Sequence, residues 1–373
     1  MRRVLWTIVI ALLFAACGGS DSYRINGVLQ GVAKGTVVTL VSLDGEVPEM
    51  LDSTRVAGSG KFHFAGQTDT CRLALVVFEA DDNLAGCQFF LESGKIDLTY
   101  DVETYRQRVS GTVCNDAFQN FYEESLILDD QVMELQDKLQ MTVVSNGDGH
   151  TLIDQLNALQ VRFRDLVAQS INDNVDNLFG YEQMQQYFDL FEPDENLAFL
   201  RKLEPYFSSD MAFLNMLSKL RKQLPTSVGR QFVNFEADRL DSKNRIAAKQ
   251  AKLSDFVSAG KLVYLDFWAS YIPACINQIP TLKAALDKYQ SKGFQIVSIS
   301  ADDEASEWVK AVKDNEMTWP QLWNGFSHDD SSAVGKYAVT ALPMSFLIDS
   351  DGTIIGRNLL ADELEEVLAD YFK

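Results

Sequence analysis

The spacing between apolar residues changes twice along this chain of 373 residues, and these changes limit the fold more than any other sequence feature. Residues 23–112 contain short runs in which apolar and polar residues alternate, as they do in β-strands. In residues 113–230 apolar residues recur three and four positions apart, as on amphipathic helices. Strand-like and helix-like runs alternate in residues 231–373. We therefore predict a multidomain chain with an all-β sandwich or barrel, a helical middle segment and a C-terminal α/β domain.

The first part is punctuated by turn signals such as Asp44-Gly45 and Ser93-Gly94. The predicted strands are rich in β-branched and aromatic residues and cover residues 36–43, 53–58, 61–66, 71–78, 87–92 and 95–102. Strands this short and this closely spaced predict antiparallel pairing in a small sandwich or barrel.

Amphipathic helices are expected in the middle segment at residues 118–140, 150–171, 196–203 and 211–224. The polar run SNGDGH at 145–150 separates the first two of them. Their apolar stripes favour packing within the protein, and an interface with a partner is the alternative.

The N-terminus carries the features of a secretory signal. Two arginines follow Met1, residues 4–14 are apolar but too few to span a membrane stably, and Ala15-Ala16 precede Cys17. This stretch resembles a bacterial lipobox, which implies that residues 1–16 are removed and that Cys17 is acylated. Residues 17–22 would then form a lipidated linker, with ordinary secretion as the alternative. We expect the protein in the bacterial cell envelope, anchored by the lipid on Cys17 and facing the periplasm or the cell exterior.

The charge balance excludes one class of partner. The chain has 53 acidic and 33 basic side chains and a formal net charge of −20. Nucleic acid binding needs clustered Lys and Arg to neutralise phosphates, so we expect no nucleic acid partner.

Two further resemblances concern the domains. The series YRINGVLQG, KGTVVTL, LDSTRVAGSGKFHFAG, FFLESGKIDL and VSGTVCNDAF is similar to a β domain of unknown function that precedes thioredoxin-like domains in bacterial lipoproteins. In the last part, LDFWASYIPACINQIP and YAVTALPMSFLIDSDGTI resemble the two signatures of TlpA/ResA-like thioredoxin-fold oxidoreductases. The resemblance implies a thioredoxin-like fold for residues 231–373. Its strands and helices are expected at 261–269, 279–290, 294–301, 304–315, 344–357 and 361–372.

The family's reaction requires two cysteines, and this motif has one. One thiolate attacks the substrate disulfide and a second, one helical turn later, resolves the mixed disulfide. The resemblance places Ile272 at the attacking position and Cys275 at the resolving position, so a dithiol cycle confined to this motif is impossible. Asp266 matches a buried carboxylate that would accept the proton of Cys275, and a purely structural role is the alternative.

Other residues of the motif match substrate-binding positions. Pro343 matches the proline that is cis in this fold and holds a substrate chain extended beside the site. Trp268, Ile272, Pro273 and Leu342 are expected to border the same surface. For Trp268, packing in the core is the alternative.

We therefore weigh two main functions. The first is binding of a protein or peptide near Pro343 without dithiol turnover. The second is thiol–disulfide oxidoreductase activity through Cys275 and a cysteine of a partner. A structural lipoprotein of a larger envelope assembly is a third reading, and we expect neither a cofactor nor a metal.

The pairing of Cys71, Cys87 and Cys114 stays open. If residues 71–78 and 87–91 form a hairpin, Cys71 and Cys87 lie at opposite ends of it, which disfavours a bond between them.

Overall fold

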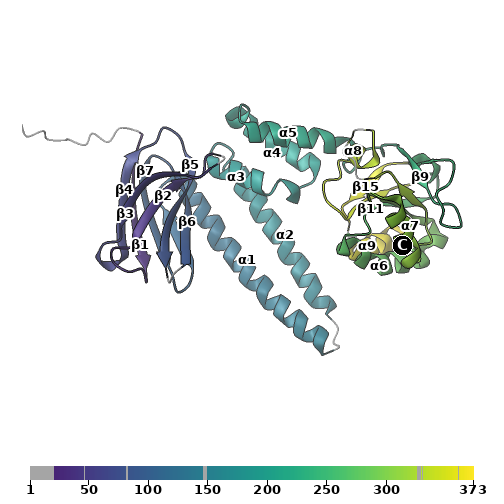
Figure 1. The fold of residues 1–373 in the computed structure, drawn as a ribbon, viewed down its shortest axis with the longest axis horizontal. Coiled ribbons are helices and arrows are strands. Elements are labelled where there is room, and N and C mark those ends of the chain that lie inside the picture. The colour runs from purple at the N-terminus through teal and green to yellow at the C-terminus, as the bar shows by residue number, and fades with distance from the viewer. Residues whose placement is uncertain are drawn as a thin grey trace, which may run out of the picture. The chain divides into compact units, whose positions relative to one another are not determined.

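The computed structural model describes the chain in several stretches: residues 21–45, 47–80, 83–145, 149–325, 329, 331–359 and 361–373. It contains two compact units (Figure 1). Unit 1 runs to Leu190 and adds Lys202–Phe207, and unit 2 comprises Phe191–Arg201 and Ser208–Lys373. The predicted signal peptide, 1–16, and Cys17 lie outside the described residues.

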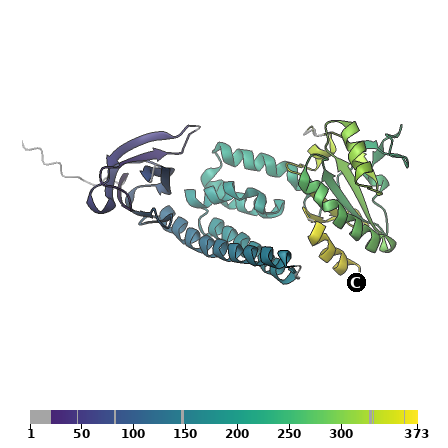
Figure 2. The same ribbon diagram turned by 60° about the horizontal axis from the view of Figure 1, so that its bottom comes forward.

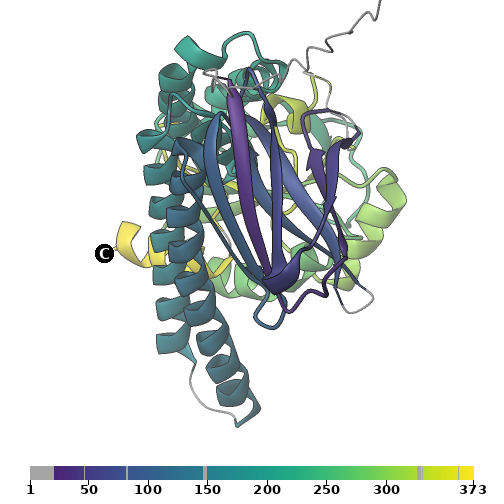
Figure 3. The same cartoon turned by 90° about the vertical axis from the view of Figure 1, so that its left-hand side faces the viewer.

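Unit 1 begins with a sandwich of two four-stranded sheets, in the orders β4-β1-β7-β8 and β3-β2-β5-β6. Its strands are β1 (Ser22–Gln30), β2 (Val37–Ser42), β3 (Glu49–Arg55), β4 (Lys61–Gln67), β5 (Arg72–Ala80), β6 (Asn83–Leu91), β7 (Gly94–Asp101) and β8 (Arg106–Ser110). Alternate residues along each sheet fill a common core. The β domain is therefore a sandwich (Figure 3). β1 starts at Ser22, the last residue of the predicted linker.

One strand pair departs from the predicted antiparallel pattern. β1 runs parallel to β7 and antiparallel to β4, so the first strand lies inside its sheet. A parallel pair needs a long crossover, and here the strands of the second sheet lie between β1 and β7 in sequence.

The helical segment consists of α1 (Val113–Val144), α2 (His150–Asp173), α3 (Leu178–Gln186), α4 (Pro193–Phe207) and α5 (Met211–Gln223), with short 3₁₀ turns η2 (Phe188–Leu190) and η3 (Leu224–Thr226). α1 and α2 run side by side (Figures 1 and 2). We predicted one helical segment, but the contacts divide it: α1, α2 and α3 belong to unit 1, α5 belongs to unit 2, and the residues of α4 are shared between the units.

Unit 2 is built on a seven-stranded sheet in the order β10-β9-β13-β12-β11-β14-β15. Its elements are β9 (Glu236–Arg239), β10 (Ala251–Lys252), η4 (Leu253–Asp255), β11 (Leu262–Trp268), α6 (Pro273–Tyr289), η5 (Gln290–Lys292), β12 (Phe294–Ser300), α7 (Ala305–Asp314), β13 (Gln321–Trp323), α8 (Ala333–Lys336), β14 (Met344–Ile348), β15 (Ile354–Arg357) and α9 (Ala361–Tyr371). β11 is parallel to β12 and antiparallel to β14. The predicted C-terminal α/β domain is confirmed, and its sheet is mixed.

The central strand β11 separates two cores. All seven of its residues are buried. Val263, Leu265 and Phe267 enter one core, and Leu262, Tyr264 and Trp268 enter the other, which also contains residues of α6, α7 and α9. Because side chains alternate along a strand, Asp266 projects to the same side as Tyr264 and Trp268, the side that packs against α6.

Among the described helices, none combines the length and the apolar character needed to cross a membrane.

Candidate functional site at the start of α6

The start of α6 is set by a proline. Pro273 is the first helical residue, where its missing N–H costs nothing, and Ile272 before it has an extended backbone. The backbone N–H of Cys275 donates to the Ile272 carbonyl at 3.0 Å, which closes the first turn. Pro273 is exposed, and Tyr271 before the turn is 62% exposed. The predicted helix boundary at 279 was wrong, because the helix already begins at Pro273 and continues through Pro280.

Cys275 points into the core. Its side chain is 4% exposed and belongs to the same cluster as Trp268 and Tyr264. Burial raises the pKa of Cys275 to about 11, and the negative charges of Asp266 and Asp302 act in the same direction. At neutral pH this sulfur is therefore a thiol, and burial outweighs the tendency of a helix N-terminus to favour the thiolate.

Ile272 places an aliphatic side chain directly before the first turn of α6. It is half-buried and packs against the cluster that holds Cys275. Leu342 is half-buried and packs against that cluster too. The structure thus brings Ile272, Leu342 and Cys275 together, with no second sulfur at this end of the described helix α6.

Asp266 is buried and hydrogen-bonded, as its burial requires. The Ser298 hydroxyl donates to Asp266 Oδ2 at 2.7 Å, and Trp319 Nε1 donates to that hydroxyl oxygen at 2.8 Å. Burial raises the pKa of Asp266 to about 6, although the Ser298 hydrogen bond opposes the shift. A carboxylate with this pKa, on the α6 side of β11, can take up a proton near neutral pH.

Trp268 does not offer the expected contact surface. Its side chain is 1% exposed and sits inside the core against α6. It packs as a core residue, the alternative that the sequence left open, and direct contact with a ligand is excluded by its burial.

The loop that follows Trp268 is held by a carboxylate that sequence reasoning missed. Asp302 Oδ1 accepts hydrogen bonds from the backbone N–H of Ser270 at 3.0 Å and from its hydroxyl at 2.6 Å. The Ser300 hydroxyl donates to the other Asp302 oxygen at 2.6 Å. The only signal in the sequence is a polar SxD run at the end of a buried strand. Asp302 fixes the backbone from which Tyr271 and Ile272 project.

The Leu342–Pro343 peptide bond is cis, as predicted. Met344 pairs with Phe267 in the β11–β14 ladder, so Pro343 lies at the end of β11 where Trp268 leads into the site. Leu342 and Pro343 are both half-buried. Among the described residues, none hydrogen-bonds to the backbone N–H or C=O of Leu342. Both of these backbone groups are therefore available to pair with another chain.

Comparisons with known proteins agree with both sequence resemblances. Residues 228–357 match the AhpC/TSA family, and residues 23–118 match a domain of unknown function, DUF4369. The thiol-disulfide oxidoreductase ResA of Bacillus thuringiensis subsp. konkukian (strain 97-27) is 29% identical over 152 residues, which cover 41% of this chain and 80% of that protein. The C-terminal domain is a ResA-like thioredoxin-fold domain.

A second ResA, from Bacillus subtilis (strain 168), is 24% identical over 123 residues, covering 33% of this chain and 65% of that protein. Two solved structures also resemble the chain. A putative thiol:disulfide interchange protein DsbE from Chlorobium tepidum is 26% identical with a TM-score of 0.34, covering 39% of this chain and 98% of that one. A thioredoxin-like protein from Bacteroides caccae is 16% identical with a TM-score of 0.46, covering 58% and 84%. The two ResA relatives are thiol-disulfide oxidoreductases, which favours the second of our two functions at the level of the family.

Proposed function

We propose that the ResA-like domain binds an extended polypeptide beside Pro343 and does not complete a dithiol cycle on its own. The observation that carries this proposal is the pair of side chains at the start of α6: an isoleucine at the attacking position and a buried thiol at the resolving position. Reduction of a disulfide by one protein needs two electrons from two thiols, and the motif supplies one.

The binding surface would be formed by Tyr271, Ile272, Pro273 and Leu342. An extended peptide can pair with the free peptide group of Leu342, as in recognition by strand addition. The exposed Tyr271 ring and the half-buried Ile272 supply apolar contact for its side chains. Trp268 would support this surface by packing in the core below it. Asp302 would support it by fixing the loop at Ser270 through hydrogen bonds.

The family comparisons support a second candidate, a thiol–disulfide oxidoreductase that works through Cys275 and a cysteine of a partner. In this reaction the Cys275 thiolate would attack a partner disulfide, form one mixed disulfide and release one partner thiolate. A thiol of the partner would then attack the partner's sulfur in the mixed disulfide, form a new partner disulfide and release Cys275, so the net change is an exchange of disulfide bonds. Asp266 is on the correct side of β11 to accept the Cys275 proton. The burial of Cys275 weighs against this candidate, because the site must open before the sulfur can react.

Insulin reduction by dithiothreitol separates the two candidates. We expect the wild type to match the uncatalysed rate, and Ile272→Cys to exceed it by at least about tenfold because the two-thiol motif is restored. The double variant Ile272→Cys, Cys275→Ser is the matched control and should lose that gain. Turnover by the wild type that disappears in Cys275→Ser would establish the second candidate and overturn the first.

Peptide binding is tested on an array of random peptides with the wild type and Leu342→Glu. The added charge should abolish binding at the Pro343 surface, whereas Ala284→Glu, which adds the same charge on an exposed part of α6, should not. Equal binding by the three proteins would contradict the proposed surface.

We also propose that Cys17 carries a lipid and that the protein faces the periplasm or the cell exterior. The support is the sequence from Met1 to Cys17. Metabolic labelling with an alkyne fatty acid should mark the wild type and leave Cys17→Ser unlabelled. Labelling of both would place the lipid elsewhere.

A further inference from the structure

Cys71 and Cys114 bring two sulfur atoms together in unit 1, outside the ResA-like domain. Cys71 directly precedes β5, and Cys114 lies in the first turn of α1. Their Sγ atoms are 3.6 Å apart, and the Cys71 thiol donates a hydrogen bond to Cys114. A movement of about 1.6 Å would bring them to the usual disulfide bond length of about 2.05 Å. Cys87 is not part of this pair, because it lies opposite Val76 along β6, as the predicted hairpin requires.

The backbone on the Cys114 side is anchored to the sandwich. The next residue, Asn115, donates to the Phe90 carbonyl at 2.7 Å and accepts from the Phe90 N–H at 2.8 Å. The Cys114 N–H donates to Glu92 Oε1 at 2.9 Å. The start of α1 is therefore fixed against the end of β6.

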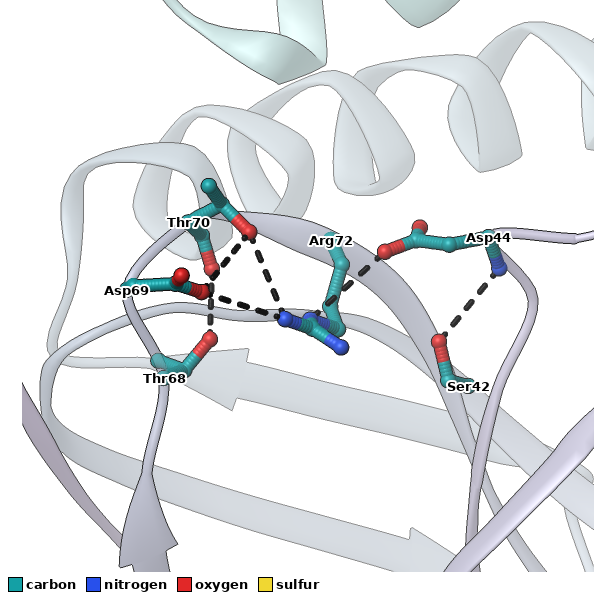
Figure 4. Close-up of polar contacts among 6 residues, drawn as sticks. All are labelled: Ser42, Asp44, Thr68, Asp69, Thr70 and Arg72. Atoms are coloured by element: carbon teal, nitrogen blue, oxygen red, sulfur yellow. Dashed lines mark hydrogen bonds and ion pairs between the residues drawn. The ribbon is translucent and has the colours of Figure 1, made fainter.

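The backbone on the Cys71 side is anchored as well (Figure 4). The Arg72 guanidinium lies between Asp44 and Asp69, with a distance of 3.5 Å to a carboxylate oxygen of each. The Thr68 hydroxyl donates to the Thr70 carbonyl at 2.6 Å and tightens the turn before Cys71. Both sulfurs are thus carried by segments with little freedom to separate.

The surroundings shift the pKa values of the two sulfurs in opposite directions. The hydrogen bond from Cys71, assisted by backbone contacts with Phe179 and Leu178 at the start of α3, lowers the pKa of Cys114 despite its burial. The same hydrogen bond, together with burial, raises the pKa of Cys71. Two sulfurs joined by a hydrogen bond have the arrangement of the reduced half of a dithiol–disulfide couple.

We propose that Cys71 and Cys114 are a redox pair that forms a disulfide and thereby joins the start of α1 to the β sandwich. The oxidant is a small or protein disulfide, R–S–S–R. Cys71, which is half-buried where Cys114 is only 2% exposed, loses its proton to solvent and attacks one sulfur of the oxidant, releasing one R–S⁻. Cys114 then loses its own proton to solvent and attacks the Cys71 sulfur, releasing the second R–S⁻. Two thiols are oxidised and one external disulfide is reduced.

A metal site is the competing reading of the same residues. One oxygen of Glu92 and the two sulfurs lie within 4.8 Å of one another. Structural zinc takes four protein ligands, and among the described residues this group supplies three. One Glu92 oxygen is also engaged by the Cys114 N–H. These contacts favour the disulfide.

The test uses the full chain, equilibrated with glutathione buffers of increasing disulfide content, quenched in acid, alkylated and digested without reductant. Mass spectrometry should show a linked peptide pair that joins Cys71 to Cys114, in a fraction that rises with the disulfide content of the buffer. Cys87→Ser is the matched control and should keep the linked pair. Cys114→Ser should leave Cys71 unlinked or joined to glutathione.

The proposal is overturned if Cys71 and Cys114 remain alkylatable in the most oxidising buffer, or if either is linked to another cysteine of the chain. It is also overturned if the reduced chain binds one equivalent of zinc through both thiols and the metal blocks their oxidation at physiological zinc. A thermal melt followed by circular dichroism adds an independent reading. Oxidation should raise the transition of unit 1 by on the order of 5–10 °C, because the bond closes a loop of more than 40 residues.

Discussion

Asp266 is the residue whose chemistry the fold alters most clearly. Among the described residues, its hydrogen-bonding environment consists of the Ser298 hydroxyl and, behind it, the Trp319 indole, and includes no basic group. Neutral donors oppose the effect of burial only in part, so the carboxylate is costly to ionise. This cost makes the stability of unit 2 depend on pH.

The pKa of Asp266 is raised in the folded state from 3.8 to about 6, so the folded state binds the proton more tightly than the unfolded state. Stability from this group is fully present below about pH 4 and is lost as the pH rises through about 6. Between pH 5 and pH 7.5 the loss is on the order of 1 kcal/mol. We expect Asp266→Asn to lack this pH dependence in urea unfolding followed by tryptophan fluorescence.

Asp287→Asn controls for the removal of one negative charge, because Asp287 is exposed on α6. It should retain the wild-type difference between pH 5 and pH 7.5. An Asp266→Asn curve with the wild-type pH dependence would show that another group titrates in this range.

The residues of the candidate site divide into those that sequence could identify and those that it could not. Ile272, Cys275 and Pro343 lie within contiguous motifs, and the motif alone places them at the start of α6 and before β14. Ser298 meets Asp266 only through the β11–β12 pairing, and Trp319, from the segment before β13, reaches the Ser298 hydroxyl. The sequence also could not show whether Trp268 is buried or exposed, because an aromatic ring at a strand end suits either a core or a surface.

At the scale of elements, prediction succeeded where apolar periodicity was long. The strand predicted at 294–301 is β12, and the helix predicted at 304–315 is α7, each within one residue at both ends. Short elements were missed, including β8, α3 and β13. They are short and form through pairing or packing with distant segments, so local pattern carries little of their signal. The strand predicted at 53–58 is shifted from β3, which runs Glu49–Arg55, because the mostly exposed start of β3 lacks alternation.

The junction between α1 and β6 depends on one amide side chain. Asn115 satisfies both backbone groups of Phe90 in a buried environment. We expect Asn115→Ala to lower the free energy of unfolding of unit 1 by about 2–3 kcal/mol, because the substitution leaves a buried donor and a buried acceptor unpaired. Chemical denaturation followed by far-ultraviolet circular dichroism measures this loss.

Asn120→Ala is the matched control on the same helix, since Asn120 is exposed. Its effect should stay within about 0.5 kcal/mol. A loss of similar size in both variants would mean that helix propensity, rather than the Phe90 contact, explains the change.

At the scale of the whole molecule, the positions of the tryptophans allow fluorescence to distinguish the two units. Of its five tryptophans, Trp6 lies within the predicted signal peptide, and Trp268, Trp308, Trp319 and Trp323 all belong to unit 2. In a chain that starts at residue 17, tryptophan fluorescence therefore reports on unit 2 alone, whereas circular dichroism reports on both units.

We expect denaturant unfolding of this chain to give a single fluorescence transition and a broader or two-step transition by circular dichroism, because each unit has its own core. The pair Asn115→Ala and Asp266→Asn provides the check. The first should move only the part seen by circular dichroism, and the second should move the fluorescence transition. Coincident curves for wild type and both variants would show that the units unfold as one.

The position of β1 in its sheet has a mechanical consequence. β1 begins at Ser22 and is hydrogen-bonded to β4 on one side and to β7 on the other along most of its length. Force between the chain before Ser22 and the start of α1 acts at one end of this sheet, because Asn26 and Ser110 both pair with Asp97, and it loads the hydrogen bonds at that end first. A protein held by its N-terminus would thus release β1 from that end, with two rows of hydrogen bonds to break.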